Sequence, residues 1–315
     1  MTVTSGVSHR TFFTYVAGVV AFAGLCLAGF VTTSAEAASN PPGHGSPPPP
    51  AATPLMHTHA HNDYLHDHPL FDALSHQFDS VEADIWLADD GAVVTDPLLI
   101  GHTKEALQHG HRLQDEYLDP LLSLVNANAD HHVYAGSTAQ VTLLVDVKSA
   151  ATTTYQVLDA LLSDPKYAPL LTVWTKTGAN TWDESPGPLR VIISGNRDMS
   201  FMLGQPVRRA AYDGRLSDLG DGLPASFMPL ISNSWPSVFQ WQGSGAMPAD
   251  ERAKLDQIVA AVHATPAQEL RFYATPDRSA QQYLSVWQVE RAADVDWLNT
   301  DELAALQSFL VAHPY

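Results

Sequence analysis

Short apolar stretches alternate with amphipathic stretches along most of the chain. In the segment 248–264, apolar residues recur at i, i+3, i+4 and i+7 from Leu255, which predicts one buried face of a helix. Between such segments lie short runs rich in apolar and β-branched residues, which are typical of strands. The pattern predicts eight strands, at Leu55–Ala60, Ser80–Trp86, Val141–Lys148, Arg190–Ser194, Arg208–Tyr212, Met228–Ser232, Leu270–Ala274 and Val295–Asn299.

Strands that alternate with helices in this way predict a parallel sheet closed into a TIM-type (β/α)8 barrel, an α/β fold. Such a barrel commonly needs about 250 residues. The chain has 315 residues, so we expect a single barrel domain over residues 55–315.

The residues before the barrel have a different composition. Arg10 precedes the apolar stretch Phe12–Val31, and Ala35-Glu36-Ala37 has the small residues that a signal peptidase accepts. This order predicts a signal peptide over residues 1–37, with a retained membrane anchor as the alternative because the stretch is nearly long enough to span a bilayer. Residues 38–54 are rich in proline and predict an extended linker. We expect a secreted protein with no stable membrane insertion once the signal is removed.

Charge and cysteine content narrow the choice of partners. The formal net charge of −18 disfavours nucleic acid and lasting contact with anionic lipid. The only cysteine, Cys26, lies inside the signal segment, so the mature chain forms no disulfide. We expect a monomer whose ligand is a small molecule or a locally docked lipid head group.

Acidic residues mark the ends of two predicted strands. A period of two places Glu82 and Asp84 on one side of their strand and apolar residues on the other. Converging carboxylates at a barrel interior are costly unless a cation neutralises them, and their oxygens suit Mg²⁺ or Ca²⁺. Asp146 and Lys148 share a face at the end of a later strand, where Asp146 completes a three-carboxylate site and Lys148 reaches a phosphate. Each pair also has an alternative without function. Glu82 and Asp84 could lie on an exposed strand face, and Asp146 and Lys148 could form a simple ion pair at a strand end.

Histidines follow the first strand and a predicted hairpin. His57, His59 and His61 alternate onto one face of the first strand, and not all of them need be catalytic. After the turn Asp89-Asp90-Gly91, the chain is predicted to return His102 towards the acidic pair. Histidine is suited to moving protons near neutral pH, so two of them beside a bound phosphate would supply an acid and a base.

Together, His61, Glu82-Ala83-Asp84, His102 and Asp146-Val147-Lys148 resemble the glycerophosphodiester phosphodiesterase and phospholipase-C-like superfamily. The motif His59-Ala60-His61-Asn62-Asp63-Tyr64 looks like the branch named after altered inheritance of mitochondria protein 6. The resemblance implies a phosphodiesterase on a TIM barrel, acting on a small phosphodiester or phospholipid head group. It also implies a divalent cation on Glu82, Asp84 and Asp146, catalysis by His61 and His102, and Lys148 facing the phosphate. Asn62 stands where the superfamily usually has Arg, which leaves the substrate open.

Other strand ends offer weaker candidates. Trp235 and Tyr273 are aromatic residues at strand ends that we expect, with Asn62, to contact substrate, although packing is the alternative for both. Two further functions stay open. An amidohydrolase-type metal barrel also begins with His-x-His, but the middle strands here do not end in histidine. The second open function is that of a secreted binding module without catalytic activity, because fold alone does not prove function.

Overall fold

The computed structural model describes residues 46–88 and 97–314. In this part of the chain the strands that form the barrel are β1 (Leu55–Ala60), β2 (Phe78–Trp86), β4 (Val141–Val147), β7 (Leu189–Gly195), β9 (Ala211–Gly214), β10 (Leu230–Ser234), β11 (Glu269–Tyr273) and β12 (Leu298–Thr300). These eight strands lie side by side and parallel in the order β11, β10, β9, β7, β4, β2, β1, β12. One parallel bridge between Arg271 and Trp297 brings the two ends of the sheet together. The result is the nearly closed TIM-type barrel that the sequence predicts.

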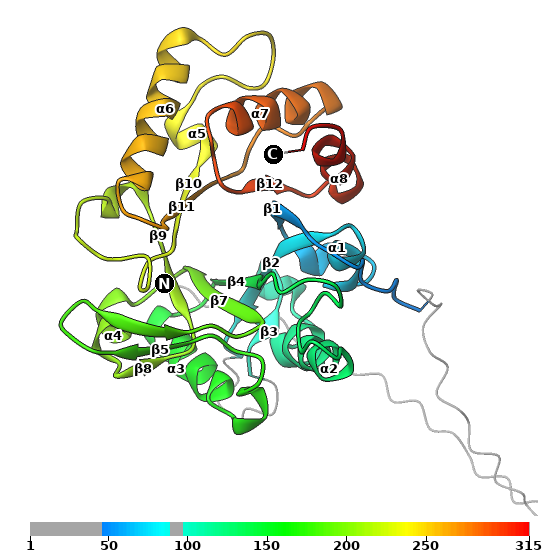
Figure 1. The fold of residues 1–315 in the computed structure, drawn as a ribbon, viewed down its shortest axis with the longest axis vertical. Helices are drawn as coiled ribbons and strands as arrows, with labels where there is room; N and C mark the ends of the chain where they lie inside the picture. Colours follow the sequence, from blue (N-terminus) through cyan, green and yellow to red (C-terminus); the bar gives the residue numbers. More distant parts are fainter. Residues whose placement is uncertain (1–45, 89–96, 315) are drawn as a thin grey trace, which may run out of the picture. The chain divides into compact units, whose positions relative to one another are not determined.

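Helices follow the strands and cover the outside of the sheet. Figure 1 shows α6, α7 and α8 lying outside strands β10, β11 and β12. The predicted helix 248–264 is confirmed, because α6 spans Ala249–His263 and buries Leu255, Val259 and Val262. The other α-helices are α1 (Phe71–Ser75), α2 (Asp119–Ala127), α3 (Ala151–Leu162), α4 (Met199–Gly204), α5 (Trp235–Val238), α7 (Ala280–Ala292) and α8 (Leu303–Ala312). Short 3-10 or π turns occur at Asp63–Leu65, Lys104–Ala106, Gln114–Leu118, Pro165–Tyr167 and Leu216–Asp218.

A small antiparallel sheet corrects one predicted strand. It contains β5 (Val173–Lys176), β6 (Trp182–Ser185) and β8 (Val207–Arg208). The predicted strand Arg208–Tyr212 is therefore split, since Arg208 belongs to this sheet and the barrel strand begins at Ala211. The buried guanidinium of Arg208 lies 5.5, 5.0 and 4.8 Å from the rings of Trp174, Trp182 and Phe227. This cation–π packing holds Arg208 outside the barrel.

The chain returns along β2 as expected from the hairpin pattern. The short strand β3 (Leu99–Ile100) pairs antiparallel with β2, with Ile100 opposite Ile85. This pairing brings the residues that follow β3 back to the end of β2. The turn Asp89-Asp90-Gly91 and the run after it lie outside the described residues.

The end of the predicted linker is attached to the barrel. Ala51 N–H donates to Leu74 O at 3.1 Å, and Gly136 N–H donates to Ala52 O at 3.1 Å. These two bonds attach Ala51 and Ala52, which lie within the predicted linker range, to the folded domain. The predicted signal peptide lies outside the described residues. Within 46–88 and 97–314, no helix is both long and apolar enough to span a bilayer.

The two sides of the barrel strands differ in polarity. On β2, Val81, Ala83 and Ile85 are fully buried on the side opposite Glu82 and Asp84. The same alternation places Ser194, Asp213 and Arg271 with the inward acidic residues. The barrel interior near the carboxyl ends of the strands is consequently lined with charged and hydroxyl groups, and this is where a TIM barrel carries its site.

Candidate active site

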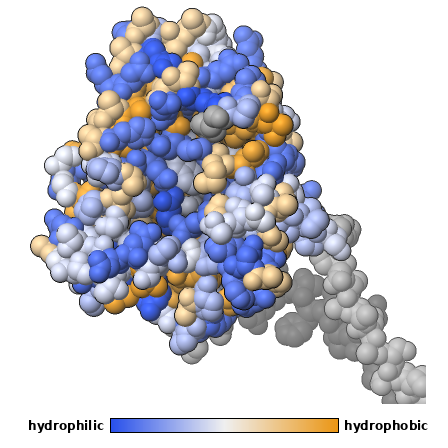
Figure 2. All heavy atoms as spheres, viewed as in Figure 1, coloured by the Kyte–Doolittle hydropathy of each residue, from blue (hydrophilic) through white to orange (hydrophobic). Residues whose placement is uncertain are grey.

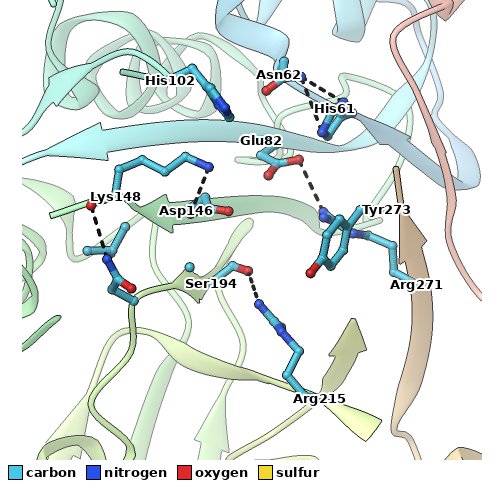
Figure 3. Close-up of a pocket in the computed structure, with 13 residues that line it drawn as sticks. His61, Asn62, Glu82, His102, Asp146, Lys148, Ser194, Arg215, Arg271 and Tyr273 are labelled. Carbon is cyan, nitrogen blue, oxygen red and sulfur yellow. Dashed lines mark hydrogen bonds and ion pairs between the residues drawn. The ribbon is translucent and has the colours of Figure 1, made fainter. Parts of the chain in front are cut away.

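A cavity of about 410 Å³ opens at the carboxyl ends of the barrel strands. The sequence-predicted residues His61, Asn62, Glu82, His102, Asp146, Lys148 and Tyr273 all line it. Figure 3 shows their side chains converging on a common space. The structure adds Val147, Ser194, Gly195, Asn196, Arg215 and Arg271 to the lining.

The three predicted carboxylates lie together, with Glu82 and Asp146 in the lining of the cavity and Asp84 fully buried beside them. Asp84 and Asp146 lie opposite each other on the paired strands β2 and β4, and Glu82 lies two residues earlier on β2. One oxygen from each of Glu82, Asp84 and Asp146 lies within 4.8 Å of the other two. Oδ1 of Asp84 is buried with no hydrogen-bond partner among the described residues. A buried carboxylate oxygen without a donor is costly, so this donor set fits a hard divalent cation such as Mg²⁺ or Ca²⁺.

The other oxygen of Asp84 is fully used by the protein. Oδ2 accepts hydrogen bonds from the Tyr64 hydroxyl at 2.8 Å and lies 2.8 Å from Nδ1 of His102. The Lys148 ammonium lies 3.1 Å from the same atom. These contacts fix the orientation of the carboxylate and leave Oδ1 as its ligand atom.

Glu82 is held by two buried partners on other strands. Nε2 of His59 lies 3.2 Å from its Oε2, and Nη1 of Arg271 lies 3.5 Å from the same oxygen. Burial alone would raise the pKa of Glu82, but the charge of Arg271 and the bond to His59 outweigh burial and lower it. Glu82 is therefore ionised at neutral pH.

Asp146 and Lys148 form an ion pair at the end of β4, with 3.3 Å between Nζ and Oδ1. Burial and the neighbouring charge of Glu82 raise the pKa of Asp146 to about 6. Burial alone would lower the pKa of the Lys148 ammonium, but the negative charges of Asp146 and Asp84 outweigh burial and raise it. Gly195 lies against this pair with a φ of +66°, and a Cβ there would collide with Asp146 Oδ1. The close approach of β7 to Asp146 thus requires glycine.

His61 lies at the end of β1 beside Asp301. Its Nδ1 is 2.9 Å from Oδ1 of Asp301 and 2.9 Å from Nδ2 of Asn62. Burial lowers the tendency of His61 to protonate, but the bond to Asp301 and the charge of Glu82 outweigh it and raise its pKa. When Nδ1 donates to Asp301, the lone pair stands on Nε2.

Asn62 shapes the turn that carries His61. It has a left-handed backbone with φ 48°, a conformation that Asn tolerates better than most residues. Its Oδ1 accepts from the Tyr64 hydroxyl at 3.0 Å. Asn62 therefore links the first histidine to the side chain that orients Asp84.

His102 stands at the rim of the cavity with 66% of its side chain exposed. Figure 3 shows His102 and His61 on either side of Glu82. The hairpin pattern therefore placed this second histidine correctly, since it meets Asp84 and faces the cavity.

Two sequence-based expectations are wrong. Trp235 is fully buried, packs on Phe239 and Phe272, and has no surface to offer a substrate. His57 does not share a face with His59, because its φ of +72° and an irregularity in the β1–β2 pairing turn it away. Its Nδ1 lies 2.6 Å from the carbonyl of Asp296 instead. Bulges of this kind invert the alternation on which the expectation depended.

The same geometry weighs against an amidohydrolase-type site. His59 is buried, with Nδ1 2.7 Å from Ser80 Oγ and Nε2 in contact with both Glu82 and Arg271. Burial and the charge of Arg271 lower the pKa of His59 to about 4. A histidine whose ring nitrogens are both occupied, beside a cation, has no lone pair to offer a metal.

The site contains residues that the sequence reasoning did not select, chiefly Arg215, Arg271, Tyr64 and Ser194. Arg271 had a usable signal, since it lies two residues before Tyr273 with the apolar Phe272 between them. Arg215 had none, because it follows a strand end with no recognisable spacing. Its position depends on neighbours that are distant in sequence.

The chain is similar to several known proteins. A family model described as AIM6-like phosphodiesterase domain matches residues 51–213, just over half of the 315 residues. The chain is 28% identical over 280 residues to altered inheritance of mitochondria protein 6 of Eremothecium gossypii, covering 81% of this chain and 69% of that protein. It is 36% identical over 151 residues to the protein of that name from Lachancea thermotolerans, covering 44% of this chain and 33% of that one.

A homolog of the same protein from Arthroderma benhamiae is 26% identical over 270 residues, covering 80% of this chain and 82% of the homolog. Among solved structures, a glycerophosphoryl diester phosphodiesterase from Parabacteroides distasonis aligns with a TM-score of 0.44 and 9% identity. That alignment covers 85% of this chain and 88% of the solved chain.

Proposed function

Because the chain belongs to the family of the AIM6-like phosphodiesterase domain, we propose that it is a secreted, metal-dependent phosphoric diester hydrolase. The observation that carries the proposal is the convergence of Glu82, Asp84 and Asp146 within 4.8 Å of one another. Glu82 and Asp146 line the cavity together with His61 and His102, which lie on either side of Glu82. Family membership agrees with the resemblance expected from the sequence motifs. The activity, the cation, the substrate and secretion are the parts that we propose.

Glu82, Asp84 and Asp146 would hold the divalent cation. Their donor atoms are carboxylate oxygens, which are the ligands that Mg²⁺ and Ca²⁺ prefer. When bound, the cation supplies Lewis-acid chemistry, neutralising the charge that develops on phosphoryl oxygens. Tyr64 keeps Asp84 in place by its hydrogen bond to Oδ2.

Lys148 would contact a non-bridging oxygen of the phosphate. The carboxylates beside it raise its pKa, so the ammonium is charged at neutral pH. It faces the cavity from the end of β4, next to Asp146. A fixed cation at this point attracts the phosphate and stabilises the charge of the transition state.

His61 and His102 would move the protons of the reaction. Nε2 of His61 would take a proton from the attacking water as the new O–P bond forms. His102 gives a proton to the oxygen of the leaving alcohol as the old P–O bond breaks, so that a diester and water yield a monoester and an alcohol. Asp301 and Asp84 hold the Nδ1 side of each ring, leaving Nε2 for the transfer.

The substrate that fits is a glycerophosphodiester or the head group of a phospholipid. Figure 2 shows hydrophilic residues gathered over the middle of one face, with apolar residues in separate patches. The cavity of about 410 Å³ is suited to a small ligand or head group. The predicted signal peptide supports secretion as the destination.

Phosphorus NMR of a panel of phosphodiesters tests the proposal. We expect hydrolysis with Mg²⁺ or Ca²⁺ and none after chelation, with product shifts that separate cyclic from open phosphates. An Asp84→Asn variant is the matched control, because it keeps the size of the side chain and loses its charge. Equal rates with and without metal would refute the metal dependence. A folded, metal-binding protein that hydrolyses no diester would identify a binding module.

A further inference from the structure

The wall of the cavity formed by β9 and β11 carries an arginine on a buried support. Asp213 is fully buried and Ser194 is 2% exposed. Ser194 Oγ donates to Asp213 Oδ2 at 2.6 Å. Arg215 Nη1 donates to the same carboxylate oxygen at 2.6 Å and to Gly214 O at 2.8 Å, and its Nη2 donates to Ser194 Oγ at 3.2 Å. Three bonds therefore fix one edge of the guanidinium before any ligand arrives.

The opposite edge of Arg215 retains donors. An arginine has five N–H groups, and within the described chain no partner is found for Nε or for the second hydrogen of Nη2. Tyr273 lies next to it, with its ring 6.0 Å from the Arg215 guanidinium carbon. The Tyr273 hydroxyl likewise has no hydrogen-bond partner among residues 46–88 and 97–314 and lines the same cavity. Arg215 and Tyr273 thus offer these donors side by side in the lining of one cavity.

This position is separate from the carboxylate site. Asp84, Asp146 and Ser194 lie in register across β2, β4 and β7, and Asp213 continues the row on β9. Neighbouring strands are about 4.8 Å apart, so Asp213 lies roughly 10 Å along this row from Asp146. Figure 3 shows Lys148 on one side of Asp146 and Arg215 on the other. A phosphate held by the carboxylate site and Lys148 thus leaves the Arg215 side for another group.

The positive charge on this side of the cavity indicates which substrate group it would bind. Arg215 and Arg271 both face the Tyr273 ring, at 6.0 and 5.7 Å. Arg271 contacts His59 and Glu82 through Nη1, and its Nε is a further buried donor with no partner among the described residues, so it adds to the positive charge beside Tyr273. Two guanidinium groups disfavour a quaternary ammonium, and a fork of N–H donors matches a phosphate or carboxylate.

We propose that Arg215 and Tyr273 form a second anion subsite, which binds a phosphate monoester or carboxylate on the alcohol arm of the diester. The inference rests on the proposed function for its choice of substrate. It makes Arg215 a residue that selects among diesters, and it predicts discrimination against choline-type head groups.

Matched chromogenic diesters test the subsite. Each has p-nitrophenol as leaving group, and the other alcohol is ethanol, 2-phosphoethanol, 3-hydroxypropanoate or choline. We expect kcat/KM to be higher for the phosphate or carboxylate arm than for the ethyl arm by about 10-fold to 100-fold, the range of a charge-assisted hydrogen bond. The phosphate and carboxylate arms distinguish the two anions. Equal kcat/KM for all four arms, or a preference for choline, would overturn the proposal.

Variants assign the preference to Arg215. In Arg215→Lys, which keeps the charge beside Asp213 and loses the fork, KM should rise more for the anionic arms than for the ethyl arm, so the ratio of kcat/KM between them should fall towards one. If Arg215→Gln fails to fold because Asp213 loses its partner, the double change Arg215→Gln with Asp213→Asn removes both charges. Arg252→Gln is the matched control, since Arg252 pairs with Asp256 at 2.9 Å on the outer helix α6. A preference that survives Arg215→Lys and the double variant refutes the subsite.

Calorimetry separates this inference from the proposed function. With Mg²⁺ present, 1,3-propanediol bisphosphate should bind more tightly than propyl phosphate, and Arg215→Lys should remove the difference. If the wild-type protein hydrolyses no diester but shows this difference, the subsite stands and the proposed function fails. If it hydrolyses diesters but binds both compounds equally, the function stands and the subsite fails.

Discussion

The two halves of the barrel contribute different chemistry to one cavity. The strands β1 to β4 and the residues directly after them bring the carboxylates, Lys148 and both histidines. The end of β9 and β11 bring Arg215, Arg271 and Tyr273. The family model covers residues 51–213 and so ends two residues before Arg215. The first half carries the groups for bond cleavage, and the second half carries groups suited to choosing what is cleaved. Variants in the first half should therefore lower kcat, whereas variants of Arg215 should alter KM.

The largest effect is expected from the histidines. His61→Ala and His102→Ala should each lower kcat by about 100-fold to 10,000-fold, the usual contribution of a positioned acid or base. Steady-state kinetics with calorimetry should show metal affinity near wild type. A bell-shaped pH profile should lose one limb in each variant.

A diester with a very good leaving group provides the control for the histidine variants. It needs little protonation of the leaving oxygen, so it should partly rescue the variant that lost the acid and not the other. Rescue of neither variant, or loss of metal binding in both, would contradict the two-histidine mechanism.

Loss of a carboxylate should abolish the metal site. Removing an outer-shell partner of a metal ligand typically costs about 10-fold to 100-fold in affinity, so Asp84→Ala and Asp146→Ala should lose more than this. Calorimetry with Mg²⁺ and Ca²⁺ measures the effect. Asp277→Ala, an exposed acid in the loop after β11, is the control. Unchanged affinity in both site variants would place the cation elsewhere.

A moderate effect on stability is expected from Glu290, in the second half of the barrel. Glu290 is fully buried on α7, and neither carboxyl oxygen has a hydrogen-bond partner in the described part of the chain. Burial raises the pKa of Glu290 well above its usual range. The neutral carboxyl is therefore the folded form, and stability falls by about 1.4 kcal/mol per pH unit as pH rises above the unfolded pKa of about 4.3.

Glu290→Met should remove this pH-dependent part and raise Tm at pH 7, with a smaller gain at pH 4. Thermal unfolding followed by circular dichroism at both pH values measures it. Gln288→Met on the exposed side of the same helix is the control. An equal change at both pH values would show that Glu290 does not titrate with folding.

The smallest effect is expected at the N-terminus. A chain that begins at Ala51 should keep kcat/KM within about two-fold, because the predicted signal peptide is removed and the proline-rich residues 38–50 have too little apolar content to pack on the barrel. A chain that begins at Leu55 loses the hydrogen bonds of Ala51 and Ala52 to the barrel. Its Tm should fall by about 2–4 °C for each kcal/mol lost. A large loss of turnover in the first of these chains would show that the linker takes part in the site.

Regular alternation explains what the sequence could predict. Glu82 and Asp84, and Asp146 and Lys148, lie two residues apart in strands, so the period of two places each pair on one face without knowledge of the rest of the fold. The eight predicted apolar runs correspond to the eight barrel strands, although β9, β10 and β12 begin two or three residues later than expected. Departures from regular alternation were not predictable. The bulge at His57 reverses one face, and Arg208 is drawn into an aromatic cluster.

Contacts across the barrel could not be predicted from local pattern either. Arg271 reaches Glu82 over a separation of 189 residues. Trp235 follows a strand end as a substrate-binding aromatic would, yet the neighbouring rings of Phe239 and Phe272 bury it. Which strand-end side chain turns inward depends on packing partners that only the folded chain brings together.

The single bridge between β11 and Trp297 has a consequence for how the barrel moves. β10 and β11 pair over five residues, whereas the junction of β11 with the β12 segment depends on the Arg271–Trp297 bridge, with Trp297 N–H donating to Leu270 O at 3.1 Å. A ring of strands opens first at its least bonded junction, so amide hydrogens there should exchange sooner than those of β4. Arg271 belongs to this junction and also balances the charge of Glu82. Opening of this junction would therefore move a counter-charge away from Glu82, and we expect the charge balance of the cavity to depend on how often the junction opens.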